Sequence, residues 1–267
     1  FTEPRPALGL KAEYIGLTSV NLTWVVNDTV SNSCMYRIEV VNDTSDRNVT
    51  SSVTKAEVTE LIPGTKYTFT VFVIVNDSQT KEVSISLYTK PSPVLDLRAE
   101  YVGMTVVNLT WAVNDSASSS YTYRIEVVSD TPDRNVTSSV TEAEVTGLIP
   151  GTEYTFTVFS VANDGQTEGE GVSISLYTKP SPVLNLKAEY VGMTVVNLTW
   201  AVNDSASSSY TYRIEVVSDT PDRNVTSSVT EAEVTGLIPG TEYTFTVFSV
   251  ANDGQTEGEG VSISLYT

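Results

Sequence analysis

The sequence predicts an all-β protein made of three β-sandwiches arranged in tandem as an elongated array. Three observations support this prediction. The 267-residue chain repeats itself with a period of 89 residues. Each repeat contains short runs in which apolar and polar residues alternate, the period of a half-buried strand. No run shows a convincing 3.6-residue period, and none approaches the roughly 18 apolar residues that a membrane span needs.

The repeat sets the expected domain limits. Repeats two and three differ at two positions only, and repeat one follows the same pattern with a deletion of two residues. The two differing pairs are Asp96 with Asn185 and Arg98 with Lys187. The deletion falls where residues 76–82 replace residues 163–171, and loops absorb length changes more readily than strands. The predicted domains are residues 1–89, 90–178 and 179–267.

The junctions between repeats contain two prolines each. Residues 1–6 align with residues 88–93 and 177–182, so we expect the first two residues to be the tail of a preceding repeat. Proline fixes φ and biases its predecessor towards extended conformations, which predicts semi-rigid connectors. With strands of about 7–10 residues, three domains should span on the order of 100 Å.

Four segments of the second repeat alternate clearly and are predicted to be strands: 107–111, 123–127, 154–158 and 172–176. Gly, Asp, Asn and Ser lie between the strands, as in a sandwich with short turns. The side chains predicted to face the core are Leu109, Trp111, Tyr123, Ile125, Val127, Val145, Leu148, Tyr154, Phe156 and Val158.

A tryptophan on the second strand and a turn sequence recur in every repeat. The tryptophans are Trp24, Trp111 and Trp200, and the run Leu-Ile-Pro-Gly-Thr-x-Tyr-Thr-Phe-Thr-Val occupies 61–71, 148–158 and 237–247. This combination resembles the fibronectin type III domain. The resemblance implies that the run enters strand F and that its tyrosine forms a tyrosine corner, with the hydroxyl satisfied by nearby backbone. The corner residues would be Tyr67, Tyr154 and Tyr243.

A narrower resemblance rests on the stretch Val-Asn-Leu-Thr-Trp-x-Val-Asn-Asp-Ser-Ala-Ser followed by Tyr-Thr-Tyr-Arg-Ile. It is similar to the ectodomain of receptor-type protein tyrosine phosphatases of the eta type. That family implies a type I membrane protein with a cytosolic phosphatase domain. The Cys-x5-Arg loop of such phosphatases is absent, since Cys34 is followed by Met-Tyr-Arg-Ile-Glu-Val. We therefore expect any enzyme of the parent protein to lie outside this chain.

The charge and the missing histidines exclude several functions. The net charge is −18, and the three repeats contribute −3, −8 and −7. An acidic surface of this kind repels nucleic acid and anionic lipid, while basic partners or calcium remain compatible with it. Without histidine there is no Ser-His-Asp or Cys-His arrangement and no imidazole metal ligand. The sequence predicts neither an enzyme nor a cofactor.

Eleven of the fifteen asparagines begin an Asn-x-Ser/Thr sequon. This density predicts an extracellular, N-glycosylated protein. The alternative is that Asn and Thr are common on β surfaces and turns and were copied by duplication. The sequons begin at Asn21, Asn27, Asn42, Asn48, Asn76, Asn108, Asn114, Asn135, Asn197, Asn203 and Asn224.

The loops 163–171 and 252–260 correspond to the FG loop, which carries ligand contacts in several fibronectin type III relatives. Each loop holds three acidic residues and three glycines. The acids could form a partner-binding tip or a weak calcium site, although a flexible, solvated loop is the favoured interpretation. The candidate contact residues are Asp164, Glu168, Glu170, Asp253, Glu257 and Glu259.

Two further features are candidates for contact or reactivity. Phe72, Phe159 and Phe248 should face outward from strand F by alternation, as a contact surface or shielded by long side chains on strands C and G. Cys34 aligns with Tyr121 and Tyr210 at the start of strand C. It is either a reactive thiol, free or bridging to another chain, or a partly buried substitution without a role.

Together these features predict a non-catalytic extracellular segment of a cell-surface receptor, of the receptor tyrosine phosphatase type. We expect the segment not to enter the membrane, while its parent is membrane-anchored. It would act as a spacer and a recognition array for an extracellular protein ligand or matrix component. The alternatives are a purely structural glycosylated stalk and an accessory module of a secreted protein.

Overall fold

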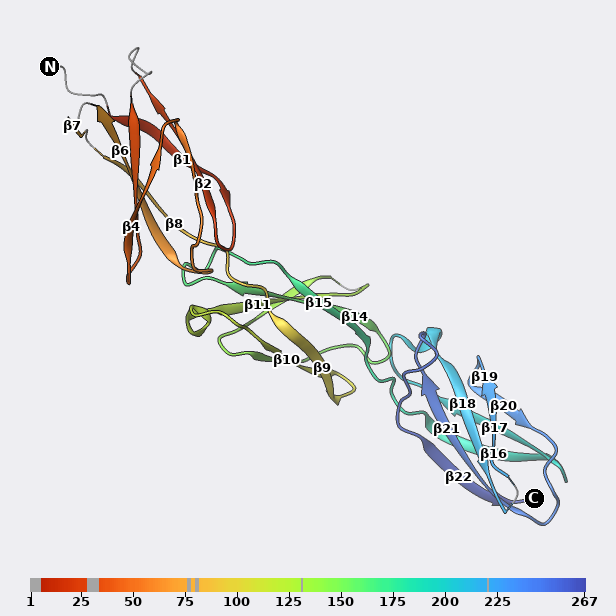
Figure 1. Ribbon diagram of the computed structural model, residues 1–267. Helices are drawn as coiled ribbons and strands as arrows, with labels where there is room; N and C mark the ends of the chain where they lie inside the picture. The colour runs from red at the N-terminus through yellow and green to blue at the C-terminus, as the bar shows by residue number, and fades with distance from the viewer. Residues whose placement is uncertain (1–5, 28–33, 76–77, 80–81, 131, 220) are drawn as a thin grey trace.

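Three β-sandwiches follow one another along a line, with the first and third repeats at opposite ends (Figure 1). The computed structural model describes residues 6–27, 34–75, 78–79, 82–130, 132–219 and 221–267. The described strands form six sheets, two in each repeat, and all pairings are antiparallel. Within these ranges no helical segment has the length and apolar character of a membrane span. The predicted all-β class and tandem arrangement are confirmed.

Each repeat pairs a three-stranded sheet with a larger sheet. In repeat one the strands are β1 (Ala7–Ile15), β2 (Val20–Val26) and β5 (Lys55–Val58), then β4 (Asp46–Ser51), β3 (Met35–Val41), β6 (Lys66–Val75), β7 (Ser78–Gln79) and β8 (Val83–Tyr88). In repeat two they are β9 (Leu95–Gly103), β10 (Val106–Ala112) and β13 (Glu142–Val145), then β12 (Arg134–Ser138), β11 (Thr122–Val128), β14 (Glu153–Val161) and β15 (Val172–Tyr177). In repeat three they are β16 (Leu184–Gly192), β17 (Val195–Ala201) and β20 (Glu231–Val234), then β19 (Arg223–Ser227), β18 (Thr211–Val217), β21 (Glu242–Val250) and β22 (Val261–Tyr266).

The core of each repeat lies between its two sheets. In repeat two, all ten residues predicted to face inward are buried and form one cluster. Trp111 on β10 and Tyr123 on β11 meet edge to face across the sandwich, with ring centroids 5.1 Å apart. This is a favoured aromatic geometry that adds to the stabilisation from burial. The same pair recurs as Trp24 with Tyr36 and as Trp200 with Tyr212.

The tyrosine corner that the family resemblance implied is present in every repeat. The hydroxyl of Tyr154 accepts a hydrogen bond from the backbone N–H of Ile149, at 3.0 Å. Tyr67 and Tyr243 accept the equivalent bonds from Ile62 and Ile238, at 3.0 and 3.1 Å. Each tyrosine therefore ties the start of its strand to the Pro-Gly turn before it.

The first strand of each repeat contains one residue in the left-handed conformation. Gly9, Asp96 and Asn185 occupy the same place in their repeats, with φ values of 61°, 52° and 53°. Glycine adopts this conformation without a steric cost, and Asp and Asn tolerate it better than other residues. The backbone therefore limits the variation allowed at this position, one of the two at which repeats two and three differ.

Tyr154→Phe is expected to lower the free energy of unfolding of the second repeat by about 1–2 kcal/mol, because the part-buried N–H of Ile149 loses its acceptor. Urea denaturation followed by tryptophan fluorescence measures the change. The double variant Tyr154→Phe/Tyr243→Phe should lose about twice as much, since distant sites act additively. Unchanged stability in both variants would show that the corner contributes nothing.

Candidate functional site

The end of each repeat is folded into the repeat itself and is not a free linker. Thr89 and Thr178 are fully buried, and their Oγ1 atoms donate to the carbonyls of Ile62 and Ile149, at 2.6 Å in both cases. The prolines that follow them, at 91 and 180, are also buried. Because hydroxyl, backbone and proline are all packed, the chain leaves each repeat in a fixed direction.

A short turn before strand β11 positions a tyrosine at the end of repeat two that faces repeat one. Asp115 Oδ1 accepts the N–H of Ala117 at 3.0 Å, which closes a local turn directly before the 3-10 turn η2 (Ser118–Ser120). Tyr121 follows the turn, and its hydroxyl donates to Asp115 Oδ2 at 2.7 Å. Burial of the side chain raises the pKa of Tyr121 above its ordinary value, and the hydrogen bond to Asp115 raises it further. Tyr121 is therefore held as a neutral, oriented ring.

This tyrosine docks on the preceding repeat. Its ring lies against Gly64, in the Pro-Gly turn of repeat one, so closely that a Cβ at this glycine would overlap it. Gly64 also has a φ of 59°, which disfavours any other residue. In the second joint Tyr210 lies against Gly151 in the same way, and its hydroxyl is 3.0 Å from the carbonyl oxygen of Pro150. The two joints use the same contact.

The near-identity of repeats two and three shows how much surface a joint covers. Gly151, which carries the next repeat, is buried, whereas its counterpart Gly240 is exposed. Met104 is 41% exposed in repeat two, and its counterpart Met193 is 79% exposed. Since the local sequences are the same, these differences are due to the third repeat packing on the second.

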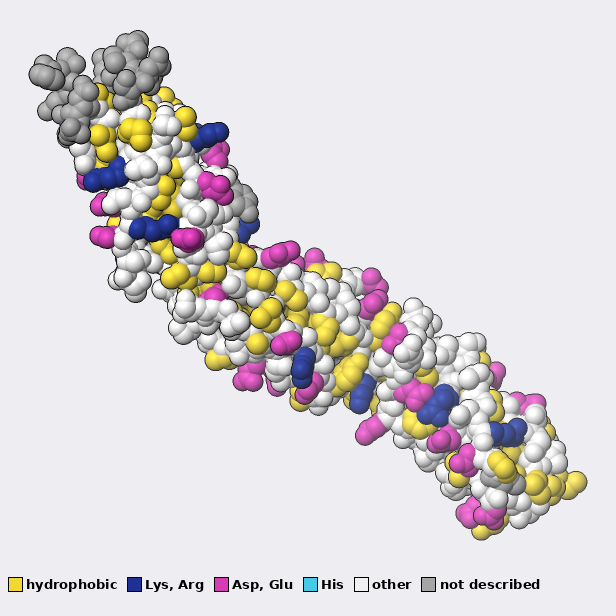
Figure 2. Space-filling view, in the orientation of Figure 1, with side chains coloured by type: hydrophobic (Ala, Val, Ile, Leu, Met, Phe, Trp, Pro, Cys, Tyr) yellow, Lys and Arg dark blue, Asp and Glu magenta, His cyan; other side chains and the backbone are white. Residues whose placement is uncertain are grey.

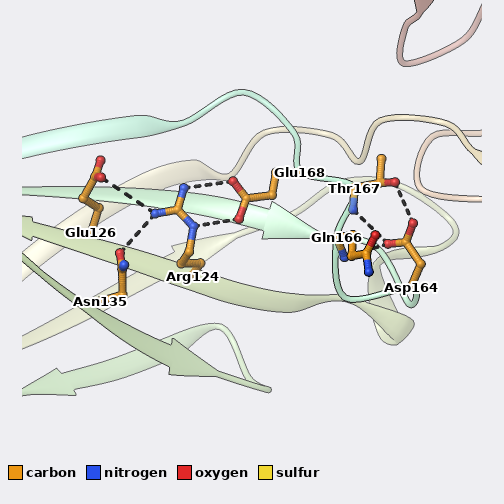
Figure 3. A network of polar contacts seen from close by, with 7 residues as sticks. All are labelled: Arg124, Glu126, Asn135, Asp164, Gln166, Thr167 and Glu168. Carbon is orange, nitrogen blue, oxygen red and sulfur yellow. Dashed lines mark hydrogen bonds and ion pairs between the residues drawn. The ribbon is translucent and has the colours of Figure 1, made fainter.

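The long loop after β14 begins with a turn held by an aspartate. Asp164 accepts hydrogen bonds from the N–H groups of Gln166 and Thr167, at 3.0 and 2.9 Å, and from the Thr167 hydroxyl at 2.7 Å (Figure 3). Burial opposes ionisation of Asp164, but the hydrogen bonds outweigh it and lower its pKa. Asp253 makes the same contacts in repeat three. The first acid of each loop therefore has a structural partner.

The second acid ties the loop to the sheet. Arg124 Nε and Nη2 donate to the two carboxylate oxygens of Glu168, at 2.6 and 2.8 Å (Figure 3). The guanidinium lies 4.1 Å from the ring centroid of Phe159, and its Nη1 donates to Asn135 Oδ1 at 3.1 Å. Hydrogen bonds from Arg124 hold the pKa of Glu168 below its ordinary value. A bidentate pair over an aromatic ring combines two favourable geometries of arginine.

The network recurs in the other repeats. In repeat three Arg213 binds Glu257 at 2.6 and 2.8 Å and lies 4.0 Å from the ring centroid of Phe248. In repeat one, where the loop is shorter, Arg37 lies over Phe72 and donates to Gln79 at 3.0 Å.

The loop also packs on the connector that precedes its own repeat. A Cβ at Gly169 would overlap the carbonyl oxygen of Pro91, and a Cβ at Gly171 would overlap the ring of Phe159. Both glycines are therefore required by close approach. The loop expected to be flexible and solvated is instead held by a capped turn, an ion pair and two tight backbone contacts.

The structure separates the predicted contact residues into groups. Asp164, Asp253, Glu168 and Glu257 serve the internal contacts described above, while Glu170 and Glu259 are exposed. In the described part of the chain no three acidic or cysteine side chains come together to hold a metal. Phe159 and Phe248 face outward, and each ring is covered by an arginine side chain. Of the two alternatives given by the sequence, the structure has the one in which long side chains shield the rings.

Two further candidates from the sequence, a cysteine and a sequon asparagine, remain. Cys34 is half-buried and packs against the core of repeat one. Asn76 lies outside the described residues. Sequence reasoning missed the docking role of Tyr121 and Tyr210, although their alignment with Cys34 marks the position at which repeat one differs.

The comparisons with known proteins agree with this architecture. The fibronectin type III domain family matches residues 3–90, 91–175 and 180–264. The chain is 65% identical to the chicken (Gallus gallus) receptor-type tyrosine-protein phosphatase eta over 100% of its own length and 19% of that protein. It is 32% identical to the human (Homo sapiens) receptor-type tyrosine-protein phosphatase H, over 98% of its length and 24% of that protein. It is 26% identical to chicken tenascin-R, over 93% of its length and 19% of that protein.

The chain spans a quarter or less of the curated receptor phosphatases that it matches, from 17% to 25% of their length. The three domain matches account for almost all of its residues. The matched segment consists of non-catalytic repeats, and it contains no catalytic domain.

Gly151→Ala is expected to loosen the joint between repeats two and three, because the added methyl would displace the ring of Tyr210. Gly240→Ala is the matched control. It has the same neighbours in sequence and a positive φ of 74°, but nothing lies within 4 Å of its Cβ position. Both variants should lose about 1 kcal/mol of stability from the left-handed backbone. Only Gly151→Ala should broaden the energy-transfer distribution between dyes on repeats two and three; equal distributions would contradict the docking role.

Glu168→Gln is expected to destabilise the second repeat by roughly 1 kcal/mol at pH 7, since both partners are partly exposed and solvent screens the pair. The pKa of Glu168 is lowered by folding, so its contribution is complete above the ordinary value of 4.5 and is lost as the pH falls through the folded value. The difference between wild type and variant should therefore shrink below about pH 4.5.

Denaturant titrations across this pH range measure the effect. Glu170→Gln is the matched control, because it removes the same charge from an exposed position in the same loop. A loss of stability in Glu170→Gln as large as that in Glu168→Gln would show that net charge, not the pair with Arg124, is responsible.

Proposed function

The chain belongs to the fibronectin type III family, and on that basis we propose that it is a non-catalytic extracellular segment of a cell-surface receptor related to the receptor-type tyrosine phosphatases. It sets distance and presents surfaces to an extracellular protein ligand or a matrix component. The observation that carries this proposal is that both joints are built by the same contact, a tyrosine of one repeat on a glycine of the repeat before. The proposed repeat limits are residues 1–89, 90–178 and 179–267.

The spacer role follows from the joints. In a chain of domains joined by free linkers, relative motion of the domains is the default expectation. Here the connector is packed on both sides, by buried Thr178 at the end of one repeat and by the loop residue Gly258 of the next, where a Cβ would overlap the carbonyl oxygen of Pro180. Fixed joints convert the number of repeats into length, which suits a segment that holds a binding surface at a set distance.

The placement of the sequons supports secretion and glycosylation. The asparagines of the ten sequons that begin at described residues are all exposed or half-buried, and none is buried. Asn114 and Asn203 lie in exposed turns next to the joints, while Asn108 and Asn135 lie on different sheets of the same sandwich. A membrane-anchored parent protein is part of the proposal, drawn from the similarity to receptor phosphatases.

The charge distribution favours a basic or neutral protein partner and disfavours nucleic acid. Acidic side chains are scattered along the visible face of all three repeats, and the few basic ones do not form a continuous surface there (Figure 2). With Glu168 and Glu257 paired internally, Glu170 and Glu259 are the loop acids left to meet a basic partner. We retain these two residues as proposed ligand contacts.

Treatment of the chain, secreted from mammalian cells, with a peptide N-glycosidase should decrease its apparent mass in several discrete steps. Each occupied sequon contributes one step. No change in mass would contradict the extracellular assignment. The same protein expressed in bacteria is the control and should not respond.

A binding test separates recognition from a purely structural stalk. Wild type and the double variant Glu170→Gln/Glu259→Gln are compared on an array of extracellular matrix and cell-surface proteins. Binding that weakens in the variant supports a recognition role for the loops. The absence of any binding partner for the wild type would favour the stalk.

A further inference from the structure

The same surface groove occurs in all three repeats beside the same sequon. It lies where β12 meets β13 in repeat two, and where β19 meets β20 in repeat three. The volumes are 480 Å³ in repeats two and three and 520 Å³ in repeat one. Small-molecule sites have volumes of about 300–1,000 Å³, so each groove has room for a ligand of one or two rings.

A sequon asparagine lines each groove. The three are Asn21, Asn108 and Asn197. Asn108 is half-buried on the central strand β10, and it lies between Glu100 of β9 and Glu144 of β13 across the sheet. By contrast, the third sequon of the repeat begins at Asn135, whose side-chain Oδ1 accepts a hydrogen bond from Arg124 on the other sheet. No hydrogen bond links the side-chain amide of Asn108 to any other described residue.

Several valines that line the groove have side chains that are more than half exposed. Val140 is 55% exposed, and its counterparts Val53 and Val229 are 51% and 55% exposed. On the opposite side of the groove, Val102 and Val191 are each 62% exposed in repeats two and three. Val140 and Val102 line one groove and present an apolar pair at the surface, and the more divergent repeat one also has a valine, Val53, at the position of Val140.

The turn that carries Val140 is held rigidly. Ser138 Oγ accepts the N–H of Val140 at 3.2 Å and lies 2.9 and 2.7 Å from the carbonyl oxygens of Val140 and Glu142. The same three contacts occur in repeats one and three. Val140 is therefore preorganised at the edge of the groove, which lowers the cost of binding against it.

We propose that each groove seats the first N-acetylglucosamine of the N-linked glycan carried by its own asparagine. This inference rests on the proposed extracellular function, since it requires glycosylation. The acetyl methyl group and the apolar face of the sugar pack between Val140 and Val102, and the sugar hydroxyls meet Glu142 and Glu144. The occupant is covalently attached at the groove, so even a modest gain from burial keeps it in place.

The consequence is that the glycans of a repeat have different roles. A sugar seated at Asn108 covers the sheet formed by β9, β10 and β13. A glycan on Asn114 starts in the exposed turn before η2, and Asn114 lines none of the three grooves, so this glycan is expected to project into solvent. The seated sugar covers only its own sheet and leaves the long loop of the opposite sheet uncovered, while Asn135, the third sequon of the repeat, lies on that opposite sheet beside Arg124.

The experiment uses the full chain, secreted by cells that retain oligomannose glycans and trimmed to one N-acetylglucosamine per site. Nuclear Overhauser effects are measured between the acetyl methyl groups and valine methyl groups. We expect contacts from the sugars on Asn108 and Asn197 to Val102 and Val191, and none from those on Asn114 and Asn203. Val140→Ser/Val229→Ser should abolish or weaken these contacts.

The matched control is Leu95→Ser/Leu184→Ser, which removes side chains of similar exposure, 46% and 45%, outside the groove. It should leave the contacts unchanged. Occupied sequons whose sugars make no contact with the valines would overturn the inference while leaving the proposed function intact. Asparagines 108 and 197 found unmodified, with the other sequons occupied, would also overturn it. A chain with no modified sequon would contradict both.

Discussion

The arrangement of the whole molecule depends on one contact, the packing of a tyrosine ring onto a glycine of the preceding repeat. Tyr121 on Gly64 and Tyr210 on Gly151 are close contacts of a side chain with a glycine of the preceding repeat, and they occupy the same place in the two joints. Each glycine is needed twice, for its positive φ and for the absence of a Cβ. If the ring moved away, the connector would still be held by the buried threonine before it and by the long loop of the following repeat, but the two repeats would lose the contact that orients one on the other.

The rest of each repeat supports this contact from two sides. On one side, the tyrosine corner holds the Pro-Gly turn against strand F, so the glycine that receives the ring is itself fixed. On the other, the Arg124–Glu168 pair and Gly169 press the long loop onto the connector at Pro91. The ends of the repeats are thus occupied by joints, and the sides remain for glycans and partners. Such a division suits a protein whose length and accessible faces both matter.

Much of the fold could be predicted from the sequence because its causes are local. Alternation at 107–111 and 154–158 identifies the strands and their buried faces, and the Pro-Gly-Thr-x-Tyr run identifies the corner. The turn at Asp164 could also have been predicted, since the run Asp-Gly-Gln-Thr is typical of a turn in which the Asp side chain accepts hydrogen bonds from the backbone N–H groups two and three residues later. In each of these features, the residues that determine the structure lie within a few positions of one another in the sequence.

The joints and the loop network could not be predicted in this way, because their partners are distant in the chain. Arg124 and Glu168 are 44 residues apart, and the sequence gives their charges but not their pairing. In the sequence, Tyr121 looks like an ordinary residue at the start of a strand. Because repeat one has Cys34 at this position, the tyrosine does not recur in every repeat and its role is not indicated by the repeat pattern. Only the packing of one repeat on another distinguishes a docking ring from a core residue.

The most direct test of this account is the distance distribution between spin labels placed on repeats two and three of the otherwise unaltered chain, measured by pulsed dipolar spectroscopy. A joint held by Tyr210 on Gly151 predicts a single narrow distance peak that does not change with ionic strength, because the contact is one of packing. A broad distribution would contradict the account and would show that the repeats move independently about a flexible connector.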